Sequence, residues 1–245
     1  MTELGGRRYW LVGASAGLGA AVARELSKMG AAVVLSARSE DELARLADDL
    51  PGRADVVPVD VADTASVARA AEAAGEIDGV VFLAGVYWPM KATEWDAERV
   101  EQMVDINFTG AVRVMGQVVP RFVARGAGHV VLTGSLSGFR GLPGATGYGA
   151  SKAGVMYLAE GMRADLQGTG VKVQLVNPGF VKTRLTEKND FRMPFIMEPE
   201  RAARLVVEHM TTDSFARNFP SGFGAMFRAA NFLPDWAYYR IAGRG

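Results

Sequence analysis

Near its beginning the chain reads Tyr9-Trp10-Leu11-Val12-Gly13-Ala14-Ser15-Ala16-Gly17-Leu18-Gly19. The apolar residues at its start predict a short buried strand, and the pattern that follows predicts a helix running to Met29. Glycines let the backbone approach a phosphate, and the helix N-terminus presents free N–H groups. The spacing Gly-x-x-x-Gly-x-Gly differs from the commonest dinucleotide-binding pattern, Gly-x-Gly-x-x-Gly. Taken alone, the stretch fits either an anion-binding turn or a merely tight connection.

The rest of the chain alternates apolar strands with amphipathic helices. Strands are predicted at 32–37, 56–59, 79–83, 129–133 and 171–176, with a candidate seventh at 215–219. Helices are predicted after Ser39, where Ser39 and Glu42 have the spacing of a capping box, from 63–64 onward, over 98–125 and over 148–167. Continuous Val/Leu strands are typical of parallel sheets buried on both faces. We therefore predict an α/β fold with one doubly wound, Rossmann-type parallel sheet in a single domain, residues 1–245.

Composition excludes several classes of protein. The chain has 245 residues, 49% of them hydrophobic, enough for one sizeable core. The 27 basic and 27 acidic residues cancel, so no nucleic-acid partner is expected. There is no cysteine, and His129 and His209 lie far apart in apolar segments, so we expect packing or surface roles for them and no metal site. The first apolar run is broken by glycines and no membrane-length segment follows, so a cytoplasmic location is expected.

A phenol and an ammonium group stand one helical turn apart in Tyr148-Gly149-Ala150-Ser151-Lys152. Positions i and i+4 share a helix face, so the charge of Lys152 is expected beside the Tyr148 ring, where it would favour the ionised phenol and lower its pKa. The spacing is common on exposed helices, so the pair needs partners before it indicates a proton-transfer site. Those partners follow the carboxyl ends of the predicted strands, where ligands bind in doubly wound sheets.

Taken in chain order, the motifs of this chain resemble those of the short-chain dehydrogenase/reductase family, in its single-domain branch. The resemblance extends from Arg8 to about Thr183. Ser135 precedes Tyr148 by 13 positions, as in that family. The resemblance implies Tyr148 as the acid and base, Ser135 as a hydrogen-bond donor to the substrate oxygen, Lys152 as the group that lowers the Tyr148 pKa and holds the nicotinamide ribose, and Asn107 as the holder of a relay water. The matching pieces are Gly13-x-x-x-Gly17-x-Gly19, Asp60, Ala84-Gly85, Asn107, Ser135, Tyr148-x-x-x-Lys152 and Pro178-Gly179.

The same resemblance implies a dinucleotide cofactor along the strand ends. Two family positions differ here: Val12 replaces a usual threonine, and Phe82-Leu83 replace two asparagines thought to brace the sheet. The implied cofactor-binding residues are Gly13, Ser15, Ala16, Gly17, Leu18, Gly19, Arg38, Ser39, Asp60, Val61, Ala84, Gly85, Tyr148, Lys152, Pro178, Gly179, Val181 and Thr183.

The end of the second strand decides between NADP and NAD. An acid there would bind the ribose 2′-hydroxyl of NAD, whereas this chain has Ala37-Arg38. Because a guanidinium can fork onto a phosphate, NADP(H) is expected and NAD is less favoured. Glu40 and Asp41 are explained by the dipole of the helix that starts there.

Three functions remain compatible with these residues. The first is an NADP(H)-dependent oxidoreductase that interconverts a carbonyl and an alcohol on a hydrophobic small molecule. The second is a non-catalytic nucleotide sensor or scaffold with the same fold, although a sensor does not need Asn107, Ser135, Tyr148 and Lys152 together. The third, an epimerase or dehydratase, normally needs a larger C-terminal domain. The predicted substrate-binding residues are Tyr87, Ser137, Phe139, Leu142 and Phe180, with a flap at about 185–199 and Arg140 and Arg192 as possible partners for an anionic group.

The aromatic-rich tail, about 220–245, lies beyond the part that resembles the family. It contains Arg228, Arg240 and Arg244, with Asp235 as its one acid. It is expected either to fold over the body or pack against another subunit of a homodimer or homotetramer, or to act as an amphipathic segment at a membrane surface.

Overall fold

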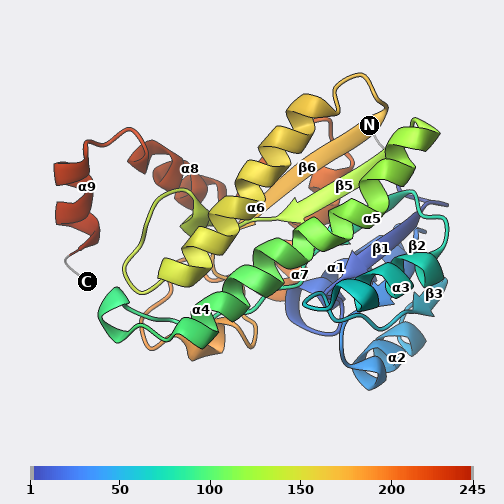
Figure 1. Ribbon diagram of the computed structural model, residues 1–245, viewed down its shortest axis with the longest axis horizontal. Coiled ribbons are helices and arrows are strands. Elements are labelled where there is room, and N and C mark those ends of the chain that lie inside the picture. The colour runs from blue at the N-terminus through green and yellow to red at the C-terminus, as the bar shows by residue number, and fades with distance from the viewer. Residues whose placement is uncertain (1–2, 244–245) are drawn as a thin grey trace.

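The computed structural model describes residues 3–243 and shows a single Rossmann-like domain built on a seven-stranded sheet (Figure 1). Every neighbouring pair of strands is parallel, and the strand order is β3-β2-β1-β4-β5-β6-β7. The predicted doubly wound parallel sheet is therefore confirmed. The strands are β1 (Arg8–Val12), β2 (Ala32–Ser36), β3 (Ala54–Val56), β4 (Gly79–Phe82), β5 (Gly128–Thr133), β6 (Val171–Pro178) and β7 (Ala216–Phe219).

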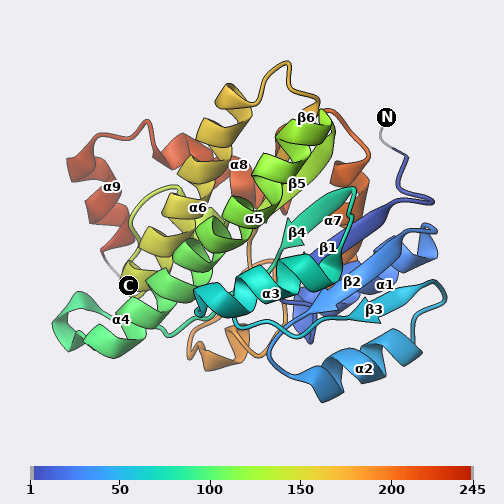
Figure 2. The same ribbon diagram turned by 45° about the vertical axis from the view of Figure 1, so that its right-hand side comes forward.

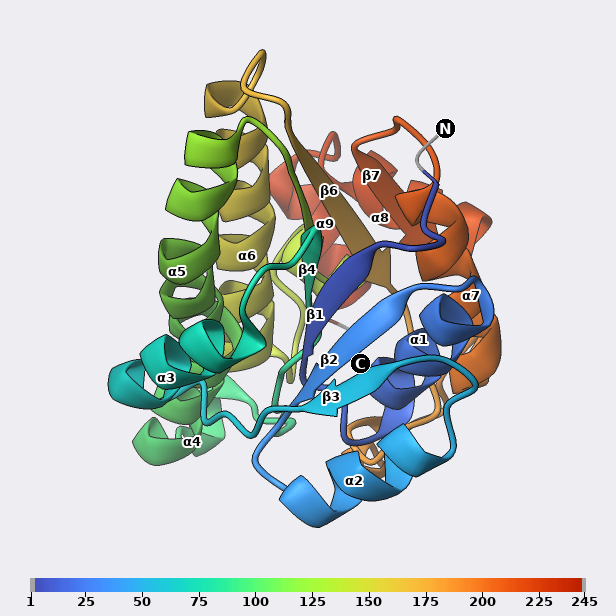
Figure 3. The ribbon, with the colours of Figure 1, turned by 90° about the vertical axis from the view of Figure 1, so that its right-hand side faces the viewer.

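Helices cover both faces of this sheet. Seen from the side in Figure 3, α1, α2 and α7 lie on one face, and α3, α4, α5 and α6 lie on the other. The helices are α1 (Gly17–Lys28), α2 (Glu40–Asp48), α3 (Thr64–Ala74), α4 (Ala97–Val104), α5 (Gly110–Arg125), α6 (Thr146–Asp165), α7 (Pro199–Met210), α8 (Ser221–Ala230) and α9 (Asp235–Ala242).

Strand β1 shows why the apolar runs form central strands. Successive side chains of a strand point to opposite faces. Tyr9 and Leu11 accordingly belong to the hydrophobic core on the α1 and α7 face, and Trp10 and Val12 to the core on the α3 and α5 face. All four are completely buried, which is possible only for a strand covered by helices on both sides.

The two histidines are buried structural residues. His129 is 2% exposed and bonds through Nε2 to Gln174 Oε1 at 2.8 Å and through Nδ1 to the Tyr9 hydroxyl at 2.9 Å. An amide oxygen only accepts, so Nε2 carries the proton and Nδ1 accepts from Tyr9. Burial lowers the pKa of His129 to about 4, which keeps the ring neutral at pH 7.

Three local predictions differ from the structure in detail. The third strand, predicted at 56–59, is Ala54–Val56, although the nitrogens of Val57 and Val59 still donate to the carbonyls of Leu35 and Ala37 at 2.9 Å. Ser39 precedes α2 but its side chain makes no capping hydrogen bond, so the capping box is not formed. The expected helix over 98–125 is divided into α4 and α5 by a π-helical segment, Asp105–Thr109, that contains Asn107.

The C-terminal helices extend the molecule beyond one end of the sheet. Figures 1 and 2 both place α8 and α9 on the side of the molecule away from α2 and β3. The loop 185–198 between β6 and α7, which contains a short 3₁₀ turn at Thr186–Lys188, corresponds to the predicted flap. Within residues 3–243, no helix is long and apolar enough to cross a membrane.

Candidate active site

The turn between β1 and α1 requires glycine at two positions. Gly13 has φ +96°, and a Cβ placed there would lie 2.4 Å from the backbone nitrogen of Ala84. A Cβ at Gly19 would lie 1.9 Å from the Gly13 carbonyl oxygen. Both contacts are far below van der Waals distance, so any side chain would force the turn, the first turn of α1 and the end of β4 apart.

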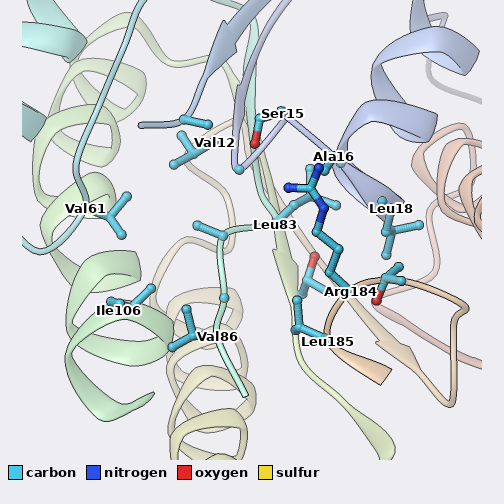
Figure 4. Close-up of a pocket in the computed structure, with 18 of the residues that line it drawn as sticks. Val12, Ser15, Ala16, Leu18, Val61, Leu83, Val86, Ile106, Arg184 and Leu185 are labelled. Carbon is cyan, nitrogen blue, oxygen red and sulfur yellow. The ribbon is translucent and has the colours of Figure 1, made fainter. Parts of the chain in front are cut away.

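This turn forms one wall of a cavity of about 590 Å³ along the carboxyl ends of the strands (Figure 4). The volume is within the range of small-molecule and cofactor sites. The order of strands reverses between β1 and β4, which is where ligands bind in such sheets. Every residue predicted to bind the cofactor lines the cavity, namely Gly13, Ser15, Ala16, Gly17, Leu18, Gly19, Arg38, Ser39, Asp60, Val61, Ala84, Gly85, Tyr148, Lys152, Pro178, Gly179, Val181 and Thr183.

Arg38 is an exposed cation on the wall of this cavity. Among the residues that the structure describes, none forms a hydrogen bond or ion pair with its side chain. A guanidinium without a partner can bind a phosphate without first giving up another contact.

Arg184 and Glu42, which no sequence pattern indicated, also line the cavity, as do Leu185 and Thr186 of the predicted flap. Arg184 Nη2 lies 3.1 Å from Glu42 Oε1, and Figure 4 shows its guanidinium on the side of the cavity where Ala16 lies. This ion pair joins α2 to Arg184, the residue before the loop 185–198. It also offsets the negative charge of Glu42. Because 142 positions separate the two residues, no local pattern could have indicated the contact.

Tyr148 and Lys152 lie together on the wall of the cavity. Lys152 Nζ is 5.8 Å from the centre of the Tyr148 ring and donates to the Thr133 carbonyl at 2.9 Å. Burial lowers the pKa of Lys152 to about 8. Burial also raises the pKa of Tyr148 to about 12, while a hydrogen bond with Ser135 acts in the opposite direction. The pKa of this phenol is therefore not below its ordinary value, contrary to the expectation from Lys152, because loss of solvation outweighs the hydrogen bond with Ser135 that lowers it.

Ser135 is held in place by the 3₁₀ turn that follows it, Leu136–Gly138. Its Oγ accepts hydrogen bonds from the Ser137 hydroxyl at 2.9 Å and from the Ser137 backbone nitrogen at 3.2 Å. The two acceptor positions are thus engaged, so Ser135 can only donate its hydroxyl proton, either to the Tyr148 oxygen as in this structure or to a carbonyl oxygen in its place. Ser137, predicted to contact substrate, here orients Ser135.

Asn107 braces the end of β4. Its Nδ2 donates to the Val86 carbonyl and to Ser151 Oγ, both at 3.0 Å, and its Oδ1 accepts from the Val86 nitrogen at 2.7 Å. Both amide protons are therefore used inside the protein. The π-helical segment turns this side chain toward the loop after β4, a distortion that often occurs at functional sites. Asn107 still lies near Lys152: a Cβ at Gly85 would be 3.3 Å from Asn107 Oδ1 and 3.7 Å from Lys152 Nζ.

Tyr87 connects the Tyr148 ring to the flap. The two rings pack edge to face with their centres 4.9 Å apart. The Tyr87 hydroxyl donates to Asn189 Oδ1 at 2.9 Å, and its carbonyl accepts from Lys188 Nζ at 2.9 Å. Phe180 joins a separate group of rings, with Phe191 at 5.9 Å and Phe223 at 6.3 Å. Two predicted substrate residues are thus placed where they hold the loop 185–198 on either side.

The remaining candidates lie differently. Phe139 packs against the core on the α5 and α6 face, and Leu142 is half-buried at the start of α6. Arg140 does not offer its charge to the cavity: it donates to the carbonyls of Ala230 and Leu233 at 2.6 and 2.8 Å and pairs with Asp235 at 2.6 Å. Its suggested role as a partner of an anionic substrate group was therefore wrong, because the tail engages it.

Comparisons with known proteins agree with this arrangement. Residues 9–192 match the family model described as short chain dehydrogenase. An uncharacterized oxidoreductase of Myxococcus xanthus is 38% identical, with an alignment that covers 100% of this chain and 99% of the relative. Another from Staphylococcus haemolyticus is 37% identical over 86% of this chain and 94% of its own length.

Solved structures give the same result. A short chain dehydrogenase/reductase family protein superposes with a TM-score of 0.83 at 28% identity, covering 91% of this chain and 100% of its own. A short-chain dehydrogenase from Sphingobium yanoikuyae, solved in complex with NADPH, gives a TM-score of 0.82 at 26% identity over 98% of this chain and 96% of its own.

Proposed function

Because the chain belongs to the short-chain dehydrogenase family and is an oxidoreductase of that family, we propose that it is an NADP(H)-dependent enzyme that interconverts a carbonyl group and an alcohol. The observation that carries the proposal is the convergence of Ser135, Tyr148 and Lys152, of which Tyr148 and Lys152 line the cavity. A donor, an acid and a buried cation in one place are what carbonyl reduction requires.

The cavity residues fit a phosphorylated dinucleotide. The Gly13–Gly19 turn leaves room for a pyrophosphate at the start of α1, where the helix dipole favours negative charge. Arg38 supplies a free guanidinium for a ribose 2′-phosphate, and Lys152 supplies a buried ammonium for the nicotinamide ribose. NADP(H) is therefore proposed, with NAD less favoured; the NADPH complex of the Sphingobium protein is consistent with this choice. When bound, the nicotinamide supplies or accepts the hydride.

The protein supplies the proton. With a pKa of about 12, Tyr148 is protonated at pH 7 and can donate its phenolic proton to a carbonyl oxygen that gains negative charge. Ser135 can donate a hydrogen bond to the same oxygen. Lys152, whose pKa of about 8 keeps it charged at pH 7, stabilises the phenolate left behind. In alcohol oxidation the same groups act in reverse.

The side chains near Tyr148 favour an apolar substrate. Tyr87 packs on Tyr148, and the ring group around Phe223 includes Phe180, Phe195 and Phe227. Arg140 is occupied by the tail, so it does not provide a site for a carboxylate or phosphate. A hydrophobic ketone or aldehyde is proposed.

The test is NADPH oxidation with a panel of apolar ketones and aldehydes, using the wild-type protein and Tyr148→Phe. The substitution removes only the acidic oxygen, so kcat is expected to fall by about 10²-fold or more while NADPH affinity stays within a few-fold. Tyr157→Phe, at an exposed tyrosine of the same helix, is the matched control. Retention of more than about a tenth of kcat in Tyr148→Phe would contradict the assignment. NADPH binding without turnover on any carbonyl would contradict the enzymatic proposal itself.

A further inference from the structure

The C-terminal helices keep large apolar side chains in solvent although they are firmly attached to the body. Phe232 is 90% exposed and Trp236 is 74% exposed, and Leu233, Tyr239 and Ile241 are exposed as well. Burial of one such side chain is worth about 1.5–3 kcal/mol. An ordered surface that leaves several of them uncovered indicates an interaction site.

Arg140 fixes this segment from the side of the active site. It donates to the carbonyls of Ala230 and Leu233 in the turn between α8 and α9, pairs with Asp235, and stacks on the Tyr238 ring at 4.0 Å. The Tyr238 hydroxyl donates to the Gly141 carbonyl at 2.7 Å. The segment is thus folded onto the loop that follows Ser135, and the orientation of α9 is determined.

This attachment decides which face of α9 meets solvent. Each helical residue is rotated by about 100° from the previous one, so positions 236 and 240 lie only about 40° apart and each lies about 160° from position 238. Because Tyr238 is buried against the body, Trp236 and Arg240 must point away from it. We call Phe232, Leu233, Trp236, Tyr239, Arg240 and Ile241 the aromatic tail surface.

The charges beside this surface are of one sign. Arg228 and Arg240 are exposed, and within residues 3–243 neither side chain has an ion-pair partner. Asp235, the one acid of the segment, is already paired with Arg140. Exposed aromatic residues with adjacent free arginines are typical of helices that lie at a lipid interface, where the rings enter the headgroup layer and the cations meet anionic lipids.

The same charges disfavour a second copy of the chain as the partner. In a two-fold interface a patch meets itself, so Arg240 would approach its own counterpart with no free acid in the segment to compensate. Like charges brought together in this way are destabilising. An anionic surface has no such penalty.

Aromatic contacts also join α8, the helix that precedes the aromatic tail surface, to the loop 185–198. Phe223 of α8 contacts Phe195 of the loop 185–198 at 5.5 Å and Phe180 at 6.3 Å. Phe191, Phe195 and Ile196 of that loop are exposed. Apolar side chains therefore extend from the neighbourhood of Phe180 to α8. We propose that the aromatic tail surface binds an anionic lipid membrane.

The test is co-flotation of the full-length protein with vesicles of phosphatidylcholine, with and without phosphatidylglycerol, at low and high salt. Binding is expected only with phosphatidylglycerol and is expected to weaken in salt. Neutralising two arginines, Arg228→Gln with Arg240→Gln, should reduce partitioning about 30-fold, since each cation near an anionic surface contributes about one kcal/mol. Phe232→Ser with Trp236→Ser should reduce it by about tenfold or more.

Two matched controls separate this surface from general effects. Arg201→Gln with Arg204→Gln removes the same charge from exposed positions of α7, and Tyr157→Ser removes an aromatic ring that is 79% exposed on α6. Neither is expected to change partitioning. Absence of the wild-type protein from the floating fraction at low salt would overturn the proposal, as would equal losses in the control variants. A smaller particle mass of Phe232→Ser with Trp236→Ser in lipid-free solution would overturn it in favour of a subunit contact.

Discussion

Replacing Arg38 by alanine should weaken the binding of NADPH much more than that of NADH. Arg38 lies on the cavity wall after β2, where a 2′-phosphate on the adenosine ribose would be the feature that distinguishes the two cofactors. Since NADH lacks that phosphate, its affinity should change only a few-fold.

The magnitude follows from the state of Arg38 in the free protein. Its side chain has no ion-pair partner among residues 3–243, so a phosphate contact replaces only water. A charge-assisted hydrogen bond of this kind contributes about 1.5–3 kcal/mol, which corresponds to about 10- to 150-fold in the NADPH dissociation constant. Arg184 is the other arginine at the cavity, but it is paired with Glu42 at 3.1 Å and would lose that contact. The loss in Arg184→Ala should therefore be smaller.

Fluorescence titration of NADPH and NADH with wild type, Arg38→Ala and Arg45→Ala measures these differences. Arg45 is an exposed arginine of α2 that does not line the cavity, so its removal controls for the change in net charge. Equal weakening of both cofactors by Arg38→Ala, or tighter binding of NADH than of NADPH by the wild type, would refute the reasoning.

Two further predictions concern stability. Arg140→Ala should leave the melting temperature of the protein unchanged but increase trypsin cleavage in 228–240. The reason is that the tail loses two hydrogen bonds from Arg140 to its carbonyls and one ion pair. Unchanged cleavage would contradict the anchoring role of Arg140. His129 takes up a proton near pH 6.5 in the unfolded chain but only near pH 4 in the folded protein, because burial lowers its pKa to about 4. Its contribution to the free energy of unfolding is therefore complete above pH 6.5 and falls by roughly 3 kcal/mol as the pH drops from 6.5 to 4. In His129→Gln this component should disappear from urea titrations over that range; parallel curves for the two proteins would show that His129 does not contribute.

The sequence determined the order of elements because the signals for them are local. The apolar runs that become β1, β2, β4 and β5 are continuous, and the helices between the strands have an apolar stripe. Gly19 is required by a contact within the turn and Gly13 by its positive φ, so this local pattern marked the turn that lines the cavity. Since parallel strands end at one edge, residues following separate strands could be assigned to one cavity before any distance was known.

Local signals failed where a distant segment decides the outcome. The capping pattern at Ser39 was present, yet the side chain makes no capping bond. No periodic pattern in the sequence marks the π-helical segment. This segment places Asn107 between Val86 and Ser151, which are 21 and 44 positions away in the chain. A helix-period pattern cannot reveal a distortion whose partners lie outside the helix.

Tertiary structure alone decided the chemistry around the charged residues. Spacing put Lys152 on the face of Tyr148, but only packing shows that both are desolvated, which raises the pKa of the phenol instead of lowering it. Arg140, which the sequence placed at the substrate, is engaged by carbonyls 90 and 93 positions later. The sequence specified which groups are present and near which strand end they lie, whereas solvation and long-range partners, which set charge state and contact, exist only once the chain has folded.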